Sequence, residues 1–186
     1  MEEPARYWTP SPSTKNPNMR IKLHQSLMLL LCGVAASSAV AESALKLQSK
    51  VVLTMALAQK MAMACVKHQR DTNGPPVDIA IYNDGAKLIY FVSMDGTSSG
   101  TGSTAMAKAE SSARFRTPSA EIGGWVKSNP AVGHVPGLLG VRGGLPIFTA
   151  SRKPLGGIGV SGAPSEVDEK CAQVGIDAIA SELRDE

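Results

Sequence analysis

The stretch GGLPIFTASRKPLGGIGVSG, residues 143–162, decides the fold of this chain. Two apolar runs, residues 145–150 and 155–160, flank the short polar turn SRKP. This pattern predicts a β-hairpin. The second run also contains GIGVSG, residues 157–162, which matches the G-x-G-x-x-G fingerprint of dinucleotide-binding proteins. The two interpretations conflict, because a dinucleotide site requires a parallel strand within a βαβ unit.

The residues after the glycines favour the hairpin. A dinucleotide site needs a further strand whose acidic residue, about 20 positions later, binds the ribose. The chain ends at Glu186, and the segment from Ser165 to that end has the pattern of a single helix. Pro164 also lies in the loop where a phosphate would meet backbone N–H groups. We therefore expect no nucleotide, and the glycines instead predict close approach by a helix, a second subunit or a flat ligand.

The rest of the chain predicts a second hairpin and several helices. Residues 77–83 and 87–94 are β-branched and aromatic and are separated by DGA, which indicates a hairpin. Apolar residues recur at helical spacing, and residues 128–137 form a loop. The predicted order is α-β-β-α-α-β-β-α in an antiparallel α/β (α+β) fold, with helices over residues 43–68, 103–116, 119–127 and from 165 onward.

The N-terminal region has the pattern of an export signal. Residues 1–18 are rich in proline, serine and threonine and are predicted to be disordered. From Met19 a basic start, the apolar run SLMLLLCGVAA and the small residues Ala39-Val40-Ala41 indicate a signal peptide over residues 19–41. The apolar run is too short for a stable membrane span. Residues 42–186 are then a single domain, expected in the periplasm or secreted.

Charge and cysteine content narrow the classes of partner. The chain carries a formal net charge of +3 but no stripe of Lys and Arg interleaved with aromatic residues, so we expect no nucleic acid. Cys65 and Cys171 remain after signal removal, and their spacing matches no metal motif. They are either a disulfide, which an oxidising compartment allows, or two small buried helical residues.

Several short motifs, in order, resemble the GlcG/HbpS-type haem-binding (haem-degrading-like) family. They are Met94-Asp95-Gly96 with Lys108-Ala109 and Phe115, then Gly143-Gly144-Leu145-Pro146-Ile147, then GGIGVSGA at residues 156–163 with Asp168, Cys171-Ala172 and Gly175. The resemblance implies profilin-like α-β-α layers with a five-stranded antiparallel sheet. It also implies a homo-oligomer, commonly an octamer, and a role in haem and iron stress protection or sensing.

Four residues are candidates for the cofactor site. Haem iron needs a donor such as His, Met, Tyr or Cys, so we consider His134, His68 and Met94, with iron bound through either histidine. Each has a simpler interpretation, as a loop residue, a helix-end residue or a core residue. Lys108 matches the family pattern and is either a ligand or subunit contact or a lysine whose stem covers an apolar surface.

The sequence identifies no catalytic residue and favours binding over catalysis. It contains neither a nucleophile elbow nor a paired-histidine metal motif. The leading hypothesis is an exported, oligomeric haem-binding protein. The alternatives are an enzyme or binding protein for a small hydroxy acid or aldehyde, and an assembly module with no ligand.

Overall fold

The computed structural model describes residues 50–184, in which both predicted hairpins are confirmed. They form one antiparallel sheet with the strand order β2–β1–β4–β3. The two inner strands pair with each other, with Asp78 opposite Ser161. The strands are β1 (Asp78–Asn83), β2 (Leu88–Ser93), β3 (Gly144–Phe148) and β4 (Pro154–Ser161).

The expectation of five strands is wrong for the described part of the chain, where the sheet has four. No further segment between residues 50 and 184 pairs with either edge strand, β2 or β3. In β3 the edge is interrupted by Pro146, which lacks the N–H group that an added strand would need. The hairpins are local features of the sequence, whereas the fifth strand was implied only by the resemblance.

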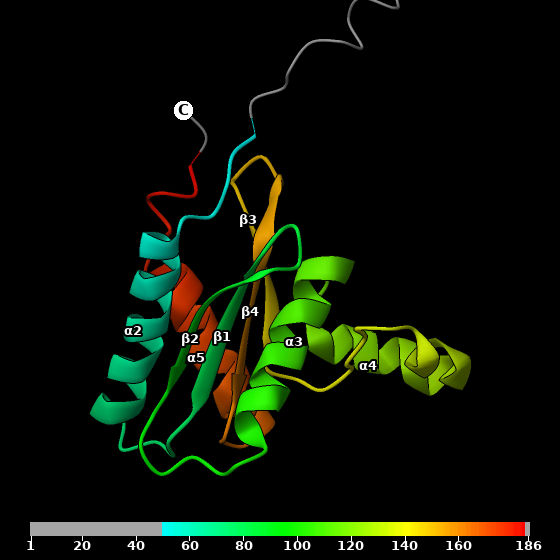
Figure 1. The fold of residues 1–186 in the computed structure, drawn as a ribbon, viewed down its shortest axis with the longest axis horizontal. Helices are drawn as coiled ribbons and strands as arrows, with labels where there is room; N and C mark the ends of the chain where they lie inside the picture. The colour runs from blue at the N-terminus through cyan, green and yellow to red at the C-terminus, as the bar shows by residue number, and fades with distance from the viewer. Residues whose placement is uncertain (1–49, 185–186) are drawn as a thin grey trace, which may run out of the picture. The chain divides into compact units, whose positions relative to one another are not determined.

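Helices cover both faces of the sheet (Figure 1). Helices α2 (Met55–Asp71) and α5 (Ser165–Asp177) pack together on one face, and α3 (Thr101–Phe115) lies on the other. Helix α4 (Ser119–Ser128) and the 3-10 helix η1 (Pro130–His134) extend away from the sheet and form an arm. The described chain therefore has an α-β-α arrangement, and the predicted order of elements is confirmed.

Helix α2 begins later than its apolar periodicity predicts. Residues 50–54 are not helical, and Thr54 is the N-cap, with its hydroxyl accepting a hydrogen bond from the Leu57 N–H at 3.3 Å. A threonine at this position satisfies an N–H group that would otherwise lack a partner, so it fixes the start of the helix. In α5, Pro164 occupies the N-cap position and Ser165 is the first helical residue, as the sequence predicts for the start of this helix.

The glycines of β4 allow helix α3 to lie directly on the sheet. A Cβ atom on Gly157 would lie 2.5 Å from the carbonyl oxygen of Ala109, and one on Gly159 would meet the backbone of Ala105. Such distances are shorter than carbon–oxygen contact permits, so only glycine fits under the helix. The sequence predicted that a helix, a second subunit or a flat ligand would approach these glycines closely. In the structure the neighbour is helix α3.

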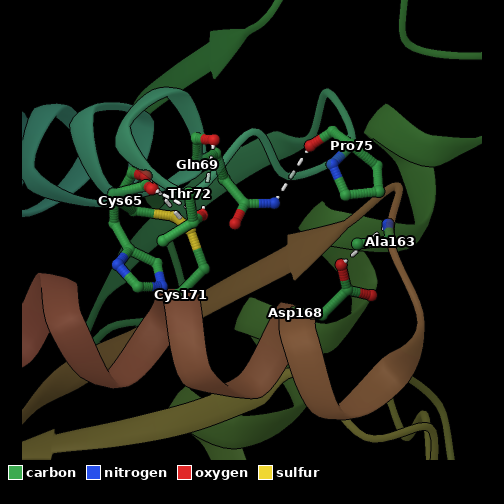
Figure 2. Close-up of a disulfide and its surroundings, with 8 residues drawn as sticks. Cys65, Gln69, Thr72, Pro75, Ala163, Asp168 and Cys171 are labelled. Carbon is green, nitrogen blue, oxygen red and sulfur yellow. Dashed lines mark hydrogen bonds between the residues drawn. A yellow bond between two sulfur atoms is a disulfide. The ribbon is translucent and has the colours of Figure 1, made fainter.

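The main core lies on the opposite face of the sheet, between the strands and helices α2 and α5. A disulfide joins Cys65 of α2 to Cys171 of α5 (Figure 2), which decides between the two interpretations of these cysteines. Both cysteines are fully buried. The largest side chains around them are Met61, Ile79, Ile81, Ile147, Ile158 and Ile179.

The predictions for residues 1–18 and 19–41 lie outside the described residues. Among residues 50–184, no helix combines the length and apolar character needed to cross a bilayer.

Candidate functional site

A buried ion pair connects α3 to α5 next to the end of β4. The Lys108 ammonium donates to an Asp168 carboxylate oxygen and to the Val160 carbonyl, each at 2.8 Å. The other oxygen of Asp168 accepts the Ala163 N–H at 3.1 Å. Both side chains are only 2% exposed. A Cβ atom on Gly143 would lie 2.8 Å from the ammonium, so glycine also makes room for this pair.

Burial and pairing act in opposite directions on Asp168. Removal from water raises the pKa of its carboxyl above the ordinary value, because the charged form loses hydration. The hydrogen bond and the charge of Lys108 lower that pKa and offset part of the increase. Lys108 is thus fully engaged inside the protein, and this arrangement favours a structural role over contact with a ligand.

His68 lies in the last turn of α2 at the edge of a hollow of about 400 Å³. At this end of the helix the Thr72 N–H and hydroxyl both donate to the His68 carbonyl, at 3.0 and 2.8 Å. The returning chain then adds Pro75 to the lining of the same hollow, and α5 contributes Glu166, Val167 and Lys170. We call this space the His68 hollow; its lining is His68, Gln69, Thr72, Gly74, Pro75, Glu166, Val167 and Lys170.

The chemistry of the His68 hollow combines an imidazole, charges of both signs and apolar surface. His68 supplies the imidazole, Lys170 a positive and Glu166 a negative charge, while Pro75 and Val167 supply apolar surface. Gln69 donates its amide N–H to the Pro75 carbonyl at 3.0 Å, as Figure 2 shows. Its side-chain oxygen is buried without a partner in the described structure. A buried acceptor of this kind usually binds a water molecule or a ligand.

The other two candidate donors lie elsewhere in the described chain. His134 is exposed at the end of η1, on the arm that Figure 1 shows on the opposite side of the sheet from α2. Met94 directly follows β2 and packs against the main core. The structure therefore does not bring His68, His134 and Met94 into one cluster. Among residues 50–184, no group of three His, Cys, Asp or Glu side chains could hold a metal ion.

Sequence reasoning missed the role of Asp168. Its position in the first turn of α5 is typical of an acid that interacts with the helix dipole, whereas in the structure it neutralises Lys108. The two residues are 60 positions apart, and neither has a local signature for pairing. The usable signal was a lysine within an alanine-rich helix, because a lysine that is buried there needs a charged partner.

Comparison with known proteins identifies a matching family model. Residues 53–177 match the model described as "Haem degrading protein HbpS-like". A search of curated proteins finds no match.

Several solved structures have a similar fold. The crystal structure of HbpS is 29% identical over 72% of this chain and 94% of that chain, with a TM-score of 0.67. A double mutant of HbpS from Streptomyces reticuli gives the same identity and TM-score and is covered over 90% of its length. The complex of PduOC with haem is 22% identical, covers 69% of this chain and 96% of that one, and has a TM-score of 0.64, which shows the fold alone.

Proposed function

Because this chain belongs to the HbpS-like family of haem-degrading proteins, we propose that it is an exported haem-binding protein. The observation that carries the proposal is the family match, which extends over almost all of the described fold. Bound haem would supply an iron centre for ligand binding or redox chemistry. The residues of this chain would hold the porphyrin and limit access of water to the iron.

The His68 hollow has the groups that haem requires. Haem needs an axial donor, an apolar surface for its macrocycle and positive charge near its propionates. His68, Val167 and Lys170 offer one of each within a single hollow. His134 is the alternative donor, and its exposed position suits a site that a second copy of the chain would complete.

The packing of α3 argues against a haem site between that helix and the sheet. The backbones of α3 and β4 approach so closely that even a methyl group on Gly157 would collide with Ala109. A macrocycle in this interface would require α3 to move. We therefore place haem on the surface of the domain or between copies in a homo-oligomer, with Met94 and Lys108 contributing to the fold.

The disulfide supports the export part of the proposal. Structural disulfides form and persist in oxidising compartments and are rare in reducing ones. Cys65 and Cys171 are bridged and fully buried, as expected for a periplasmic or secreted protein. The same compartment suits a role in protection against, or sensing of, free haem and iron. Fractionation of cells that express the full chain would test export, and an unprocessed cytoplasmic product would contradict it.

Titration of the purified protein with hemin tests the haem proposal. We expect a saturable change in the Soret band, and we expect His68→Ala to weaken binding about tenfold or more through loss of the iron–imidazole bond. His134→Ala serves as the matched control, because it removes the same group from the arm. Absence of a Soret change in the wild-type protein would refute the proposed function. If His68→Ala binds hemin as tightly as the wild-type protein and His134→Ala does not bind it, the haem site would lie on the α4–η1 arm.

A further inference from the structure

A second cleft lies along the free edge of strand β3, between the start of α4 and the side of α5. It has a volume of about 640 Å³, within the range of small-molecule sites. We call it the β3-edge cleft; its lining is Arg116, Thr117, Pro118, Glu121, Leu145, Pro146, Phe148, Thr149, Arg152, Gln173 and Ile176. These residues come from the α3–α4 connection, α4, the β3–β4 hairpin and α5. None is a His, Met, Cys or Tyr, so the described lining offers haem iron no such donor.

Two arginines give the β3-edge cleft its positive charge. Arg116 follows the last residue of α3, and Arg152 lies in the turn between β3 and β4. Both are exposed, and neither forms an ion pair with another residue of the described chain. The Arg152 guanidinium stacks over the Phe148 ring at 4.3 Å from its centroid, which restricts the orientation of the guanidinium.

Both arginines also have left-handed backbone conformations, with φ of 54° for Arg116 and 66° for Arg152. This conformation costs roughly 1 kcal/mol in a residue with a Cβ atom, and glycine would avoid the cost. Such residues gather at functional sites more often than elsewhere. Here the conformation occurs at two arginines from separate elements that line one cleft.

The remaining lining favours an organic ligand over an added strand. Leu145, Phe148 and Ile176 give the cleft an apolar wall. Pro146 removes a hydrogen-bond donor from the edge of β3, which discourages pairing with a strand of another chain. Inorganic anions gain nothing from an apolar wall, whereas the carbon skeleton of an organic acid does.

The charge balance of the cleft suits a doubly charged ligand. Glu121 is the only acidic group in the described lining, so two positive charges face one negative charge. The N-cap of α4 is Pro118, whose carbonyl accepts the Glu121 N–H at 3.0 Å. Pro118 makes no side-chain cap hydrogen bond, so the N–H groups of Ser119 and Ala120 in this ten-residue helix are not capped by it. These groups add partial positive charge at the same end of the cleft.

We propose that the β3-edge cleft binds a small organic dicarboxylate. One carboxylate pairs with Arg116 and the other with Arg152, through the two parallel hydrogen bonds that a guanidinium offers. The carbon chain between them lies against Phe148 and Leu145. This site is separate from the haem site proposed above and does not depend on it.

Isothermal titration with succinate, using the full chain, tests the site. We expect saturable binding, with Arg116→Gln and Arg152→Gln each weakening it about tenfold or more, since each loses a charge-assisted pair. Glu121→Gln should tighten binding several-fold, because it removes repulsion. Arg70→Gln, an exposed arginine of α2 outside this cleft, is the matched control and should leave affinity unchanged. Unchanged thermal melting of each variant shows that its fold is intact.

Three results would overturn this inference. The first is no succinate binding by the wild-type protein. The second is equal binding of inorganic phosphate, which would reveal a general anion surface. The third is competition between hemin and succinate, with Arg116→Gln weakening both, which would make the cleft part of the haem site. Failure of the hemin titration alone leaves the dicarboxylate site standing, so the two proposals fail independently.

Discussion

Replacing Lys108 with methionine tests the role of the buried ion pair most directly. Methionine keeps the length and apolar stem of the side chain but removes the charge. Asp168 then keeps one protein hydrogen bond, from the Ala163 N–H, while its charge stays 2% exposed and unpaired. Removing one partner of such a pair costs about 3–5 kcal/mol. A domain of this size has a free energy of unfolding of about 5–15 kcal/mol, so a large share would be lost.

Urea unfolding followed by circular dichroism measures this loss as a shift in the midpoint. The double variant Lys108→Met/Asp168→Leu supplies the control, because it removes both charges and should recover most of the stability. A cost of less than about 1 kcal/mol for Lys108→Met would refute the reasoning. The reasoning would also be refuted if Lys108→Met cost the same in a protein whose Asp168 is already replaced by leucine, because the two residues would then not interact. Reduced hemin binding without loss of stability would instead support Lys108 as a ligand contact.

The pH dependence of the unfolding free energy of Lys108→Met gives an independent test of the direction in which the Asp168 pKa is shifted. The folded protein holds the proton of Asp168 more tightly than the unfolded chain does, because burial raises its pKa above the ordinary 3.8. Its contribution to stability is therefore most favourable below the unfolded pKa and is lost as pH rises through the folded one. Without Lys108 the folded pKa rises further. The difference in unfolding free energy between variant and wild type should therefore shrink as pH falls from neutral toward 4.

Two further predictions concern the packing of the helices. Gly157→Ala should cost about 1–3 kcal/mol of unfolding free energy or more, because the added methyl group meets Ala109. Gly124→Ala, with open space around it, should be neutral or stabilising by up to about 1 kcal/mol. Thermal melting of both variants tests this prediction, and equal melting temperatures would contradict it. The disulfide joins cysteines that are 106 positions apart and so closes a long loop of the chain. Its reduction should lower the unfolding free energy by about 4–5 kcal/mol, because the unfolded chain regains the entropy that the loop restricts. Urea unfolding with and without reductant measures that loss. Three free thiols in the unfolded, unreduced full chain, instead of the one of Cys32, would show that Cys65 and Cys171 are not bridged.

The sequence was most informative where the signal is local. Alternating apolar residues and the turns DGA and SRKP predicted both hairpins. The G-x-G-x-x-G match could be set aside because the residues described after Gly162 form a helix and no further strand. The start of α2 was missed, since the cap at Thr54 outweighs an apolar periodicity that continues upstream. A count of five strands had no support in the residues themselves.

The features that the sequence could not fix depend on contacts between distant residues. The Lys108–Asp168 pair spans 60 positions and the disulfide spans 106, and periodicity within one helix carries no information about its partner. The β3-edge cleft was also missed. Arg116 and Arg152 have backbone conformations usually signalled by glycine or asparagine, and their sequence neighbours give no sign that they share a cleft. By contrast, His68 could be named as a candidate because its chemistry alone singles it out.

The bridge between the first and last helices of the described domain has a topological consequence. It closes residues 65–171 into a covalent ring that contains the whole sheet, α3 and the α4–η1 arm. A protease that cuts the exposed arm once would therefore open the ring without separating the molecule. Both pieces would migrate together on a non-reducing gel and part only after reduction, so damage at the arm need not release the rest of the protein.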